Sequence, residues 1–398
     1  MYFQSIDDKS ECIGVYYNSE CNFEDIDFSK LTKTWKATQS LLEHEHVEYA
    51  YLYSQGKSIS DVCPEHIRPE WDEVHGRISA FLKSLKIAKV DLSRNCFFDV
   101  VPLKDISNFL EMKNRITRHV FENCEKPKEY NHLLSVARLT EEIKNSPVNI
   151  DFKSLKADSY RQKVMKFMKS LKSTKRSVSY NIFGTKTGRL TVDRGHFPVL
   201  TLDKELRKYI VPNNDLFVEI DINGAEIRTL ISLLGLEQPN VDIHEWNAEN
   251  VYEGATRDEA KKRFFAWLYN PASEDRLSSK RYDREEIKRK FWDGEYVRTP
   301  FKRKIESDEY HCINYTLQST SSDICLEQAA KVRDYLSTMK SKIAFLMHDS
   351  IIVDFSASEK SKLLEIINIF RDTRFGKYGI NVNIGKNFGE LKELKWIK

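Results

Sequence analysis

The stretch that decides the fold is residues 216–228, which read LFVEIDINGAEIR. Its first half is an apolar run typical of a buried strand, and the run ends at Asp221. Asn223-Gly224 is a strong turn signal, and residues 225–234 predict a helix. A carboxylate at the end of a strand projects toward a cleft and suits a hard divalent cation. The alternative is an ordinary turn or cap residue.

A second stretch, residues 343–355, reads IAFLMHDSIIVDF. Two apolar runs flank a short polar tip, which predicts a hairpin with buried strands and Asp349 at its tip. Carboxylates on neighbouring strands, here Asp221 and Asp349, can hold two Mg²⁺ about 3.5–4 Å apart and so promote phosphoryl transfer. A solvated hairpin that binds nothing is the alternative interpretation.

A third stretch, residues 257–269, reads RDEAKKRFFAWLY. Residues at intervals of four form one row along a helix, and here they are Arg257, Lys261, Phe265 and Tyr269. The two cations would hold a triphosphate, and the two aromatic rings would pack against a sugar and a base. Taken alone, a basic amphipathic helix is more often ordinary protein surface.

A basic tract precedes these stretches, because residues 153–189 contain eleven Lys or Arg. Apolar residues recur within it at helical spacing, and Lys163, Lys166 and Lys169 fall outside that apolar stripe. A solvated helix face is the usual meaning of such a run. The other meaning is a clamp on a phosphate backbone, which needs positive charge along its length.

Length and composition narrow the classes of protein. The 398 residues suggest two to three domains, and 63 basic against 60 acidic residues give a net charge of +3, which excludes a uniformly basic wrapping protein. No apolar run is long enough for a membrane span. The seven cysteines form no C-x-x-C pair and no leader opens the chain, so a reducing, cytoplasmic location is expected. Residues 1–5 resemble the remnant of a cleaved tag and are given no function.

The three stretches, in this order, resemble motifs A, B and C of family A DNA polymerases, the DNA polymerase I type. Residues 221–228 are similar to motif A, D-Y-S-Q-I-E-L-R, and keep its Asp, Glu and Arg. Residues 257–269 match R-x3-K-x3-F-x3-Y of motif B, and His348-Asp349 stands where motif C has H-D-E. Three further segments also resemble the family, namely T-G-R-L at 187–190, D-I-H at 242–244 and N-Y-T-L-Q-S-T-S-S-D-I at 314–324. The resemblance covers about residues 130–398.

This resemblance implies an α+β, right-hand polymerase fold. The palm would contain an antiparallel sheet, the fingers and a short thumb would be helical, and a mixed α/β domain would precede them. The implied domains are 1–125 as an N-terminal domain of unknown role, 126–195 as the thumb, 196–235 as the palm with motif A, 236–305 as the fingers and 306–398 as the palm with motif C. The first of these would be an exonuclease relic or an accessory domain.

The resemblance also implies a reaction, cofactors and site residues. The enzyme would add dNTPs to a primer 3′-hydroxyl with two Mg²⁺ ions, for which Mn²⁺ could substitute. The catalytic metal ligands would be Asp221, Asp349 and the carbonyl of Ile222. The nucleotide-binding residues would be Arg257 and Lys261 on the triphosphate, Phe265 on the sugar, Tyr269 by the nascent base pair, and Glu226 as the steric gate against a ribose 2′-hydroxyl. The primer–template residues would be Arg189, Asn314, Gln318, His348, Lys163, Lys166 and Lys169.

Two departures from the family pattern carry alternatives. Motif C has Ser350 where an acid is usual, as in single-subunit RNA polymerases of the same superfamily, although those enzymes lack the equivalent of Glu226. The spans 146–189 and 269–314 are short for the family, which predicts a reduced thumb, reduced fingers and low processivity without a partner. The alternatives are therefore an RNA polymerase or primer-synthesising enzyme and, in another class, a non-catalytic DNA-binding protein.

The remaining expectations concern proofreading and partners. No D-x-E follows the predicted strand at 13–17, and 25–27 (D-I-D) has no predicted strand before it, so no proofreading exonuclease is expected. The expected partners are primer–template DNA, dNTPs and a processivity or replisome protein, with no membrane. A phage-encoded protein in a bacterial cytoplasm fits this set.

Overall fold

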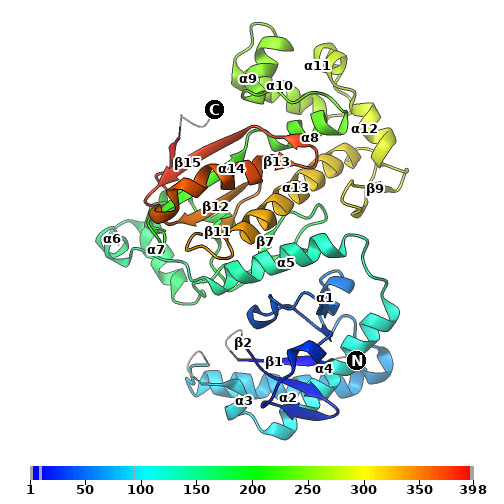
Figure 1. The fold of residues 1–398 in the computed structure, drawn as a ribbon, viewed down its shortest axis with the longest axis vertical. Coiled ribbons are helices and arrows are strands. Elements are labelled where there is room, and N and C mark those ends of the chain that lie inside the picture. The colour runs from blue at the N-terminus through cyan, green and yellow to red at the C-terminus, as the bar shows by residue number, and fades with distance from the viewer. Residues whose placement is uncertain (1–2, 9–10, 93–94, 395–398) are drawn as a thin grey trace. The chain divides into compact units, whose positions relative to one another are not determined.

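The computed structural model describes residues 3–8, 11–92 and 95–394. The chain forms two compact units, Met1–Asn145 and Ser146–Lys398. Each unit combines helices with small β-sheets, so the expected α+β class is confirmed (Figure 1). The division falls after helix α5 (Tyr130–Asn145), which places that helix in the first unit. The finer division into thumb, palm and fingers stays a prediction.

The first unit contains a three-stranded antiparallel sheet in the order β1-β2-β3. The predicted strand at 13–17 is confirmed within β2. Helix α2 carries Pro69 in its first turn and buries Trp71 and Ile78 two turns apart. The elements of this unit are β1 (Gln4–Asp8), β2 (Glu11–Tyr17), β3 (Glu20–Asn22), β4 (Lys33–Thr34), β5 (Glu48–Tyr49), α1 (Ala50–Tyr53), α2 (Arg68–Ile87), α3 (Phe97–Val100), α4 (Leu103–Asn123) and α5 (Tyr130–Asn145).

Two short segments of this unit need comment, and for the second the expectation is corrected. Residues 3–5, set aside as resembling a tag remnant, are buried, and the amide of Gln4 donates to Thr117 Oγ1 at 3.0 Å. Met1 and Tyr2 lie outside the described residues. The segment 25–27 does follow a strand, because β3 ends at Asn22. Asp27 is exposed there and caps a short 3-10 helix by accepting from the N–H of Ser29 at 3.1 Å.

The second unit is built on a five-stranded antiparallel sheet in the order β11-β12-β8-β15-β16. Strand β8 lies at its centre, and its apolar residues Val218 and Ile220 are fully buried. Helices α13 and α14 pack against this sheet, and α8 packs against α13 (Figure 1). The strand at 216–222, the turn and the helix after it are therefore confirmed, as is the hairpin of β11 and β12.

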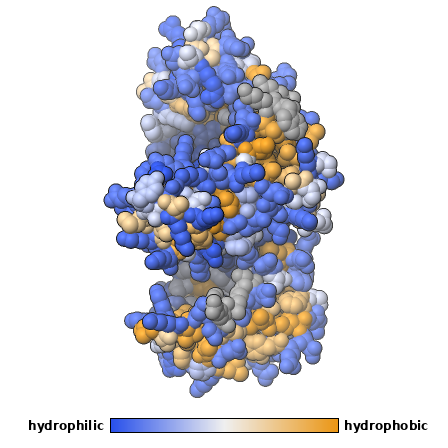
Figure 2. Space-filling view, turned by 90° about the vertical axis from the view of Figure 1, so that its left-hand side faces the viewer, coloured by the Kyte–Doolittle hydropathy of each residue, from blue (hydrophilic) through white to orange (hydrophobic). Residues whose placement is uncertain are grey.

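The remaining helices of this unit lie at two ends of it. Helices α9 to α12 gather at one end, and α6 and α7 lie at the other (Figure 1). Helix α7 buries Val164 and Phe167 and exposes lysines, as the apolar spacing predicted. Figure 2 views the side that carries α6 and α7 and shows a mostly hydrophilic surface there. No helix among the described residues is both long and apolar enough to cross a membrane.

The helices of the second unit are α6 (Phe152–Ala157), α7 (Gln162–Leu171), α8 (Ala225–Leu233), α9 (Ile243–Asn250), α10 (Arg257–Tyr269), α11 (Arg276–Arg281), α12 (Arg284–Phe291), α13 (Cys312–Leu336) and α14 (Leu363–Arg371). Its strands are β6 (Tyr180–Asn181), β7 (Thr191–Val192), β8 (Leu216–Ile222), β9 (Tyr296–Arg298), β10 (Lys304–Glu306), β11 (Lys342–Leu346), β12 (Ser350–Phe355), β13 (Asp372–Thr373), β14 (Gly376–Lys377), β15 (Ile380–Gly385) and β16 (Lys392–Glu393).

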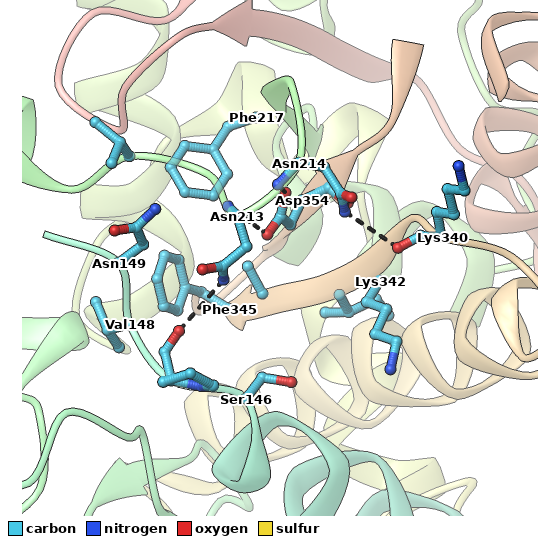
Figure 3. Close-up of a pocket in the computed structure, with 14 residues that line it drawn as sticks. Ser146, Val148, Asn149, Asn213, Asn214, Phe217, Lys340, Lys342, Phe345 and Asp354 are labelled. Carbon is cyan, nitrogen blue, oxygen red and sulfur yellow. Dashed lines mark hydrogen bonds between the residues drawn. The ribbon is translucent and has the colours of Figure 1, made fainter. Parts of the chain in front are cut away.

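A cavity of about 290 Å³ lies at the end of the sheet that is remote from Asp221 (Figure 3). Its walls include Phe217 and Phe345, and its polar groups are engaged in holding the turn before β8. The Asp354 carboxylate accepts from the backbone N–H groups of Asn213 and Asn214, each at 2.8 Å. Because Asp354 is only 5% exposed, its carboxylate is largely shielded from water, and the two hydrogen bonds anchor the start of the central strand.

Replacing Asp354 by Ala would leave both N–H groups without their acceptor. We expect the free energy of unfolding to fall by about 2–4 kcal/mol, since each hydrogen bond to a charged group contributes about 1.5–3 kcal/mol. Thermal melts followed by circular dichroism would measure the change. Asp334→Ala is the matched control, because Asp334 is exposed and pairs with Arg333 on the same helix. Equal melting temperatures for both variants would contradict the anchoring role.

Candidate active site

The two acids singled out in the sequence lie together at one end of the central strands. Asp221 on β8 stands opposite Ser350 on β12, and the N–H of Ile222 donates to the carbonyl of Asp349 at 3.0 Å. Asp221 and Asp349 line one cavity of about 330 Å³. Six other residues predicted for the site line the same cavity, namely Arg189, Ile222, Glu226, Arg257, Lys261 and Phe265.

The acids share an environment that opposes their ionisation. Burial raises the pKa of Asp221 to about 7, and the nearby charges of Glu219 and Asp349 act in the same direction. Burial also raises the pKa of Asp349, although the positive charge of Arg189 opposes this effect. Clustered carboxylate oxygens that are costly to ionise suit a hard divalent cation, which would relieve their repulsion. The donor set therefore fits Mg²⁺.

The turn after β8 requires glycine. Gly224 adopts φ +65°, and a Cβ there would come within 2.4 Å of Ile243 Cγ2. Asn223 joins this turn to the start of α9, because its Oδ1 accepts from the N–H of Ile243 at 3.0 Å and its Nδ2 donates to Asp242 at 2.6 Å. Arg228 is fully buried and donates to the carbonyl of Asn223 at 2.7 Å. These contacts fix the backbone next to Asp221.

Helix α10 has the bounds that the sequence predicted, Arg257–Tyr269, and begins with a capping box of Thr256 and Glu259. Arg257, Lys261 and Phe265 all face the cavity. The guanidinium of Arg257 makes two hydrogen bonds to Asp242, at 3.2 and 2.9 Å. The row therefore forms as expected, and its first cation is already paired with an acid.

Glu226 is held by two partners, although its carboxylate also borders the cavity. Arg189 Nη2 donates to Oε1 at 2.7 Å, and the hydroxyl of Tyr269 donates to Oε2 at 2.5 Å. The ring of Tyr269 stacks on that of Phe265, with centroids 5.8 Å apart. Burial and the charge of Glu226 raise the pKa of Tyr269, so the hydroxyl keeps its proton and remains the donor. Glu226 thus has a fixed position.

The other predicted residues lie outside the lining of this cavity. Gln318 on α13 accepts from Thr187 Oγ1 at 2.7 Å, and Asn314 lies one turn earlier on that helix. His348 is exposed at the hairpin tip. The remaining three are the lysines of α7, which lie at the other end of the unit: Lys163, Lys166 and Lys169.

The three α7 lysines differ in their surroundings. Lys163 forms ion pairs with Asp203 and Glu205, at 3.1 and 3.2 Å. Lys166 and Lys169 are exposed. A lysine that already pairs with two carboxylates adds less positive charge to a surface than an exposed one, so Lys166 and Lys169 are the stronger candidates for phosphate contacts.

Three residues with polar side chains that line the cavity were missed as site residues. His244 is buried, and burial together with Lys261 lowers its pKa to about 4, so the ring is neutral near pH 7. The D-I-H segment was the available signal for it. Asn223 was interpreted only as a turn residue. Asn381 on β15 lies opposite Asp221, and no sequence motif marked it.

Comparison with known proteins assigns no function to this cavity. No protein family model matches this chain, and no curated protein matches it either. Function must therefore be argued from the residues that line the cavity, their charges and their hydrogen bonds.

Asp221→Asn should stabilise the metal-free protein in a pH-dependent way. Because the pKa of Asp221 lies at about 7 in the folded chain against 3.8 in the unfolded chain, stability falls as pH rises through that window. An asparagine side chain cannot ionise, so the stability of the variant does not fall over this pH range. In EDTA at about pH 8 we expect the variant to melt about 2–4 °C above wild type. This corresponds to a difference of ~1 kcal/mol in the free energy of unfolding, a small value because Asp221 is partly exposed to solvent.

The difference should largely vanish at about pH 3, below both pKa values, where the wild-type carboxyl is mostly protonated in both states. Adding Mg²⁺ should raise the melting temperature of wild type more than that of the variant. An ion stabilises the folded chain only by binding to it, and the variant lacks the Asp221 carboxylate that would bind the ion. Differential scanning calorimetry measures both effects. A difference that is the same at both pH values would contradict this account of Asp221.

Proposed function

We propose that this chain is a template-directed DNA polymerase of the family A type, which adds dNTPs to a primer 3′-hydroxyl and releases pyrophosphate. The observation that supports it best is the single cavity in which Asp221 and Asp349 meet Arg257, Lys261 and Glu226. Acids on rigid strands face cations on a helix across a space open to solvent. That arrangement suits a reaction at a phosphate group.

Each part of the cavity has a distinct task in this proposal. Asp221, Asp349 and the carbonyl of Ile222 would hold Mg²⁺, which supplies charge neutralisation at the reacting phosphate. Arg257 and Lys261 would bind the triphosphate, and Arg257 would exchange its contact with Asp242 for a phosphate oxygen. Binding at these cations orients the α-phosphate toward the acids. Base selection would come from pairing with the template and not from side chains.

Sugar selection would depend on Glu226 and its two partners. A carboxylate whose oxygens are both engaged cannot turn aside, so it would exclude a ribose 2′-hydroxyl from the space it fills. Phe265 and Tyr269, which stack on each other, would pack on the sugar and beside the new base pair. This tethered carboxylate favours DNA synthesis over the RNA polymerase alternative.

Primer–template DNA would be held by the remaining predicted residues. The exposed lysines of α7 would contact phosphates, and Arg189, Asn314, Gln318 and His348 would lie along the duplex near the primer end. The palm, fingers and thumb of the right-hand fold belong to the same proposal, as do the absence of proofreading, a processivity or replisome partner, and a place in a bacterial cytoplasm.

Primer extension tests the proposal directly. With a labelled primer–template, dNTPs and Mg²⁺, we expect wild type to extend the primer and Asp221→Asn or Asp349→Asn to be slower by about 10³-fold or more, as expected when a group essential to the reaction is lost. Asp215→Asn is the control, because Asp215 lies just before β8 but contacts Ser356 and Ala357 outside the cavity.

The same assay separates the alternatives. Extension with rNTPs as fast as with dNTPs would favour an RNA polymerase. Salt-dependent binding of the template without extension under any nucleotide or metal condition would favour a non-catalytic DNA-binding protein. Wild-type rates for both aspartate variants would show that the acids are placed wrongly.

Removing Glu226 should relax sugar selection. In Glu226→Ala the space is open, and we expect the preference for dNTP over rNTP, measured as a ratio of kcat/KM, to fall by about tenfold or more, which is ~1.4 kcal/mol. Glu226→Gln is the matched control, because it keeps the volume and can still hydrogen-bond Tyr269. If the alanine variant gains no ribonucleotide incorporation, Glu226 is not the gate.

A further inference from the structure

Two asparagines on β15 stand opposite two acids on β8. In the antiparallel register Asn381 faces Asp221, and Asn383 faces Glu219. Asn383 Nδ2 donates to Glu219 Oε2 at 2.7 Å, and the side chain of Asn381 lies close enough to Asp221 to lower the pKa of that carboxyl. Residues two apart on a strand point to the same face, so both pairs lie on the face of the sheet that carries Asp221.

An amide is well suited to the place of Asn381. Glu219, Asp221 and Asp349 already bring three negative groups close together. A further carboxylate there would add repulsion, and a lysine would add a fixed positive charge that competes with a cation. The neutral amide donates a hydrogen to a carboxylate without changing the charge of the cluster. It can therefore fix the orientation of Asp221 and leave its charge available.

Asp221 is thus flanked by neutral side chains on both neighbouring strands. Ser350 of β12 lies opposite it on one side and is only 4% exposed, and Asn381 of β15 lies opposite it on the other. Asn381 also lines the cavity together with both acids. No other residue of β15 lines that cavity. Among the described residues of this strand, Asn381 is therefore the one placed to act on the site.

We propose that Asn381 is a positioning residue of this site, which orients the carboxylate of Asp221 from the neighbouring strand and so sets the affinity of the acid pair for a divalent cation. The role of that cation in nucleotide addition rests on the proposed function. The effect of Asn381 on cation binding does not, because it can be measured without nucleotide or DNA.

The test titrates the full chain with Mn²⁺ alone and follows free Mn²⁺ by electron paramagnetic resonance. We expect Asn381→Ala to weaken Mn²⁺ binding by about tenfold, as for the loss of one hydrogen bond to a charged group. Asn383→Ala is the matched control, because it removes the same amide from the same strand but from Glu219 instead. Its affinity should stay within about threefold of wild type. Circular dichroism confirms that each variant is folded.

A second variant tests whether the position needs a side chain that can donate a hydrogen bond to Asp221. Asn381→Thr suits a strand and keeps a donor that can reach across to the neighbouring strand, so it should retain most of the Mn²⁺ affinity. Unchanged affinity in Asn381→Ala, an equal loss in Asn383→Ala, or a threonine variant as weak as the alanine one would each overturn the proposal.

Primer extension supplies the separate reading of the reaction. Asn381→Ala should need more Mg²⁺ for half-maximal rate and should keep its KM for dNTP within about twofold, since Arg257 and Lys261 are untouched. A large rise in that KM with no change in the Mg²⁺ requirement would contradict positioning of Asp221. If wild type extends no primer at all, the proposed function fails, and the Mn²⁺ titration still decides the role of Asn381.

Discussion

The candidate site of the second unit depends on the antiparallel pairing of β8 with β12, because this pairing brings the carboxylates of Asp221 and Asp349 close together. Asp221 is the last residue but one of β8, and Asp349 immediately precedes β12. The hydrogen bond from the N–H of Ile222 to the carbonyl of Asp349 closes the ladder between them. The two carboxylates repel each other, and the charge of Asp349 contributes to raising the pKa of Asp221 to about 7. Only strands fixed by a fully buried core can hold like charges together at this cost. Val218, Ile220 and their neighbours on β12 provide that core.

Local patterns predicted the elements that carry the chemistry. The turn at Asn223-Gly224, the apolar run before it and the four-residue spacing of α10 are short-range features, and each formed where the sequence placed it. The residues Gly224 and Thr256 explain the agreement, because a left-handed turn and a helix cap are set by the residue itself. The juxtaposition of Asp221 with Asp349 was predicted only as a hypothesis about neighbouring strands.

Long-range pairing explains what the sequence could not predict. The order β11-β12-β8-β15-β16 places β15 beside β8, although more than a hundred residues separate them in the chain. Nothing in the sequence marks Asn381 as a site residue until that pairing is known. The contact between Asp242 and Arg257 was likewise not predicted. The burial of residues 3–5 was also not foreseen, because their contacts with β2 and with Thr117 of α4 join segments that are apart in the chain.

The two guanidinium groups that border the cavity are paired with acids other than Asp221 and Asp349. Arg189 donates to Glu226, and Arg257 donates to Asp242, so each guanidinium that borders the cavity has an acid of its own. Lys261 is exposed and lowers the pKa of Asp221 without reaching it through a hydrogen bond that the structure records. A site built only for stability would have paired Asp221 with one of these cations, because a buried carboxylate is costly to leave unpaired. The arrangement therefore favours a ligand that brings its own positive charge.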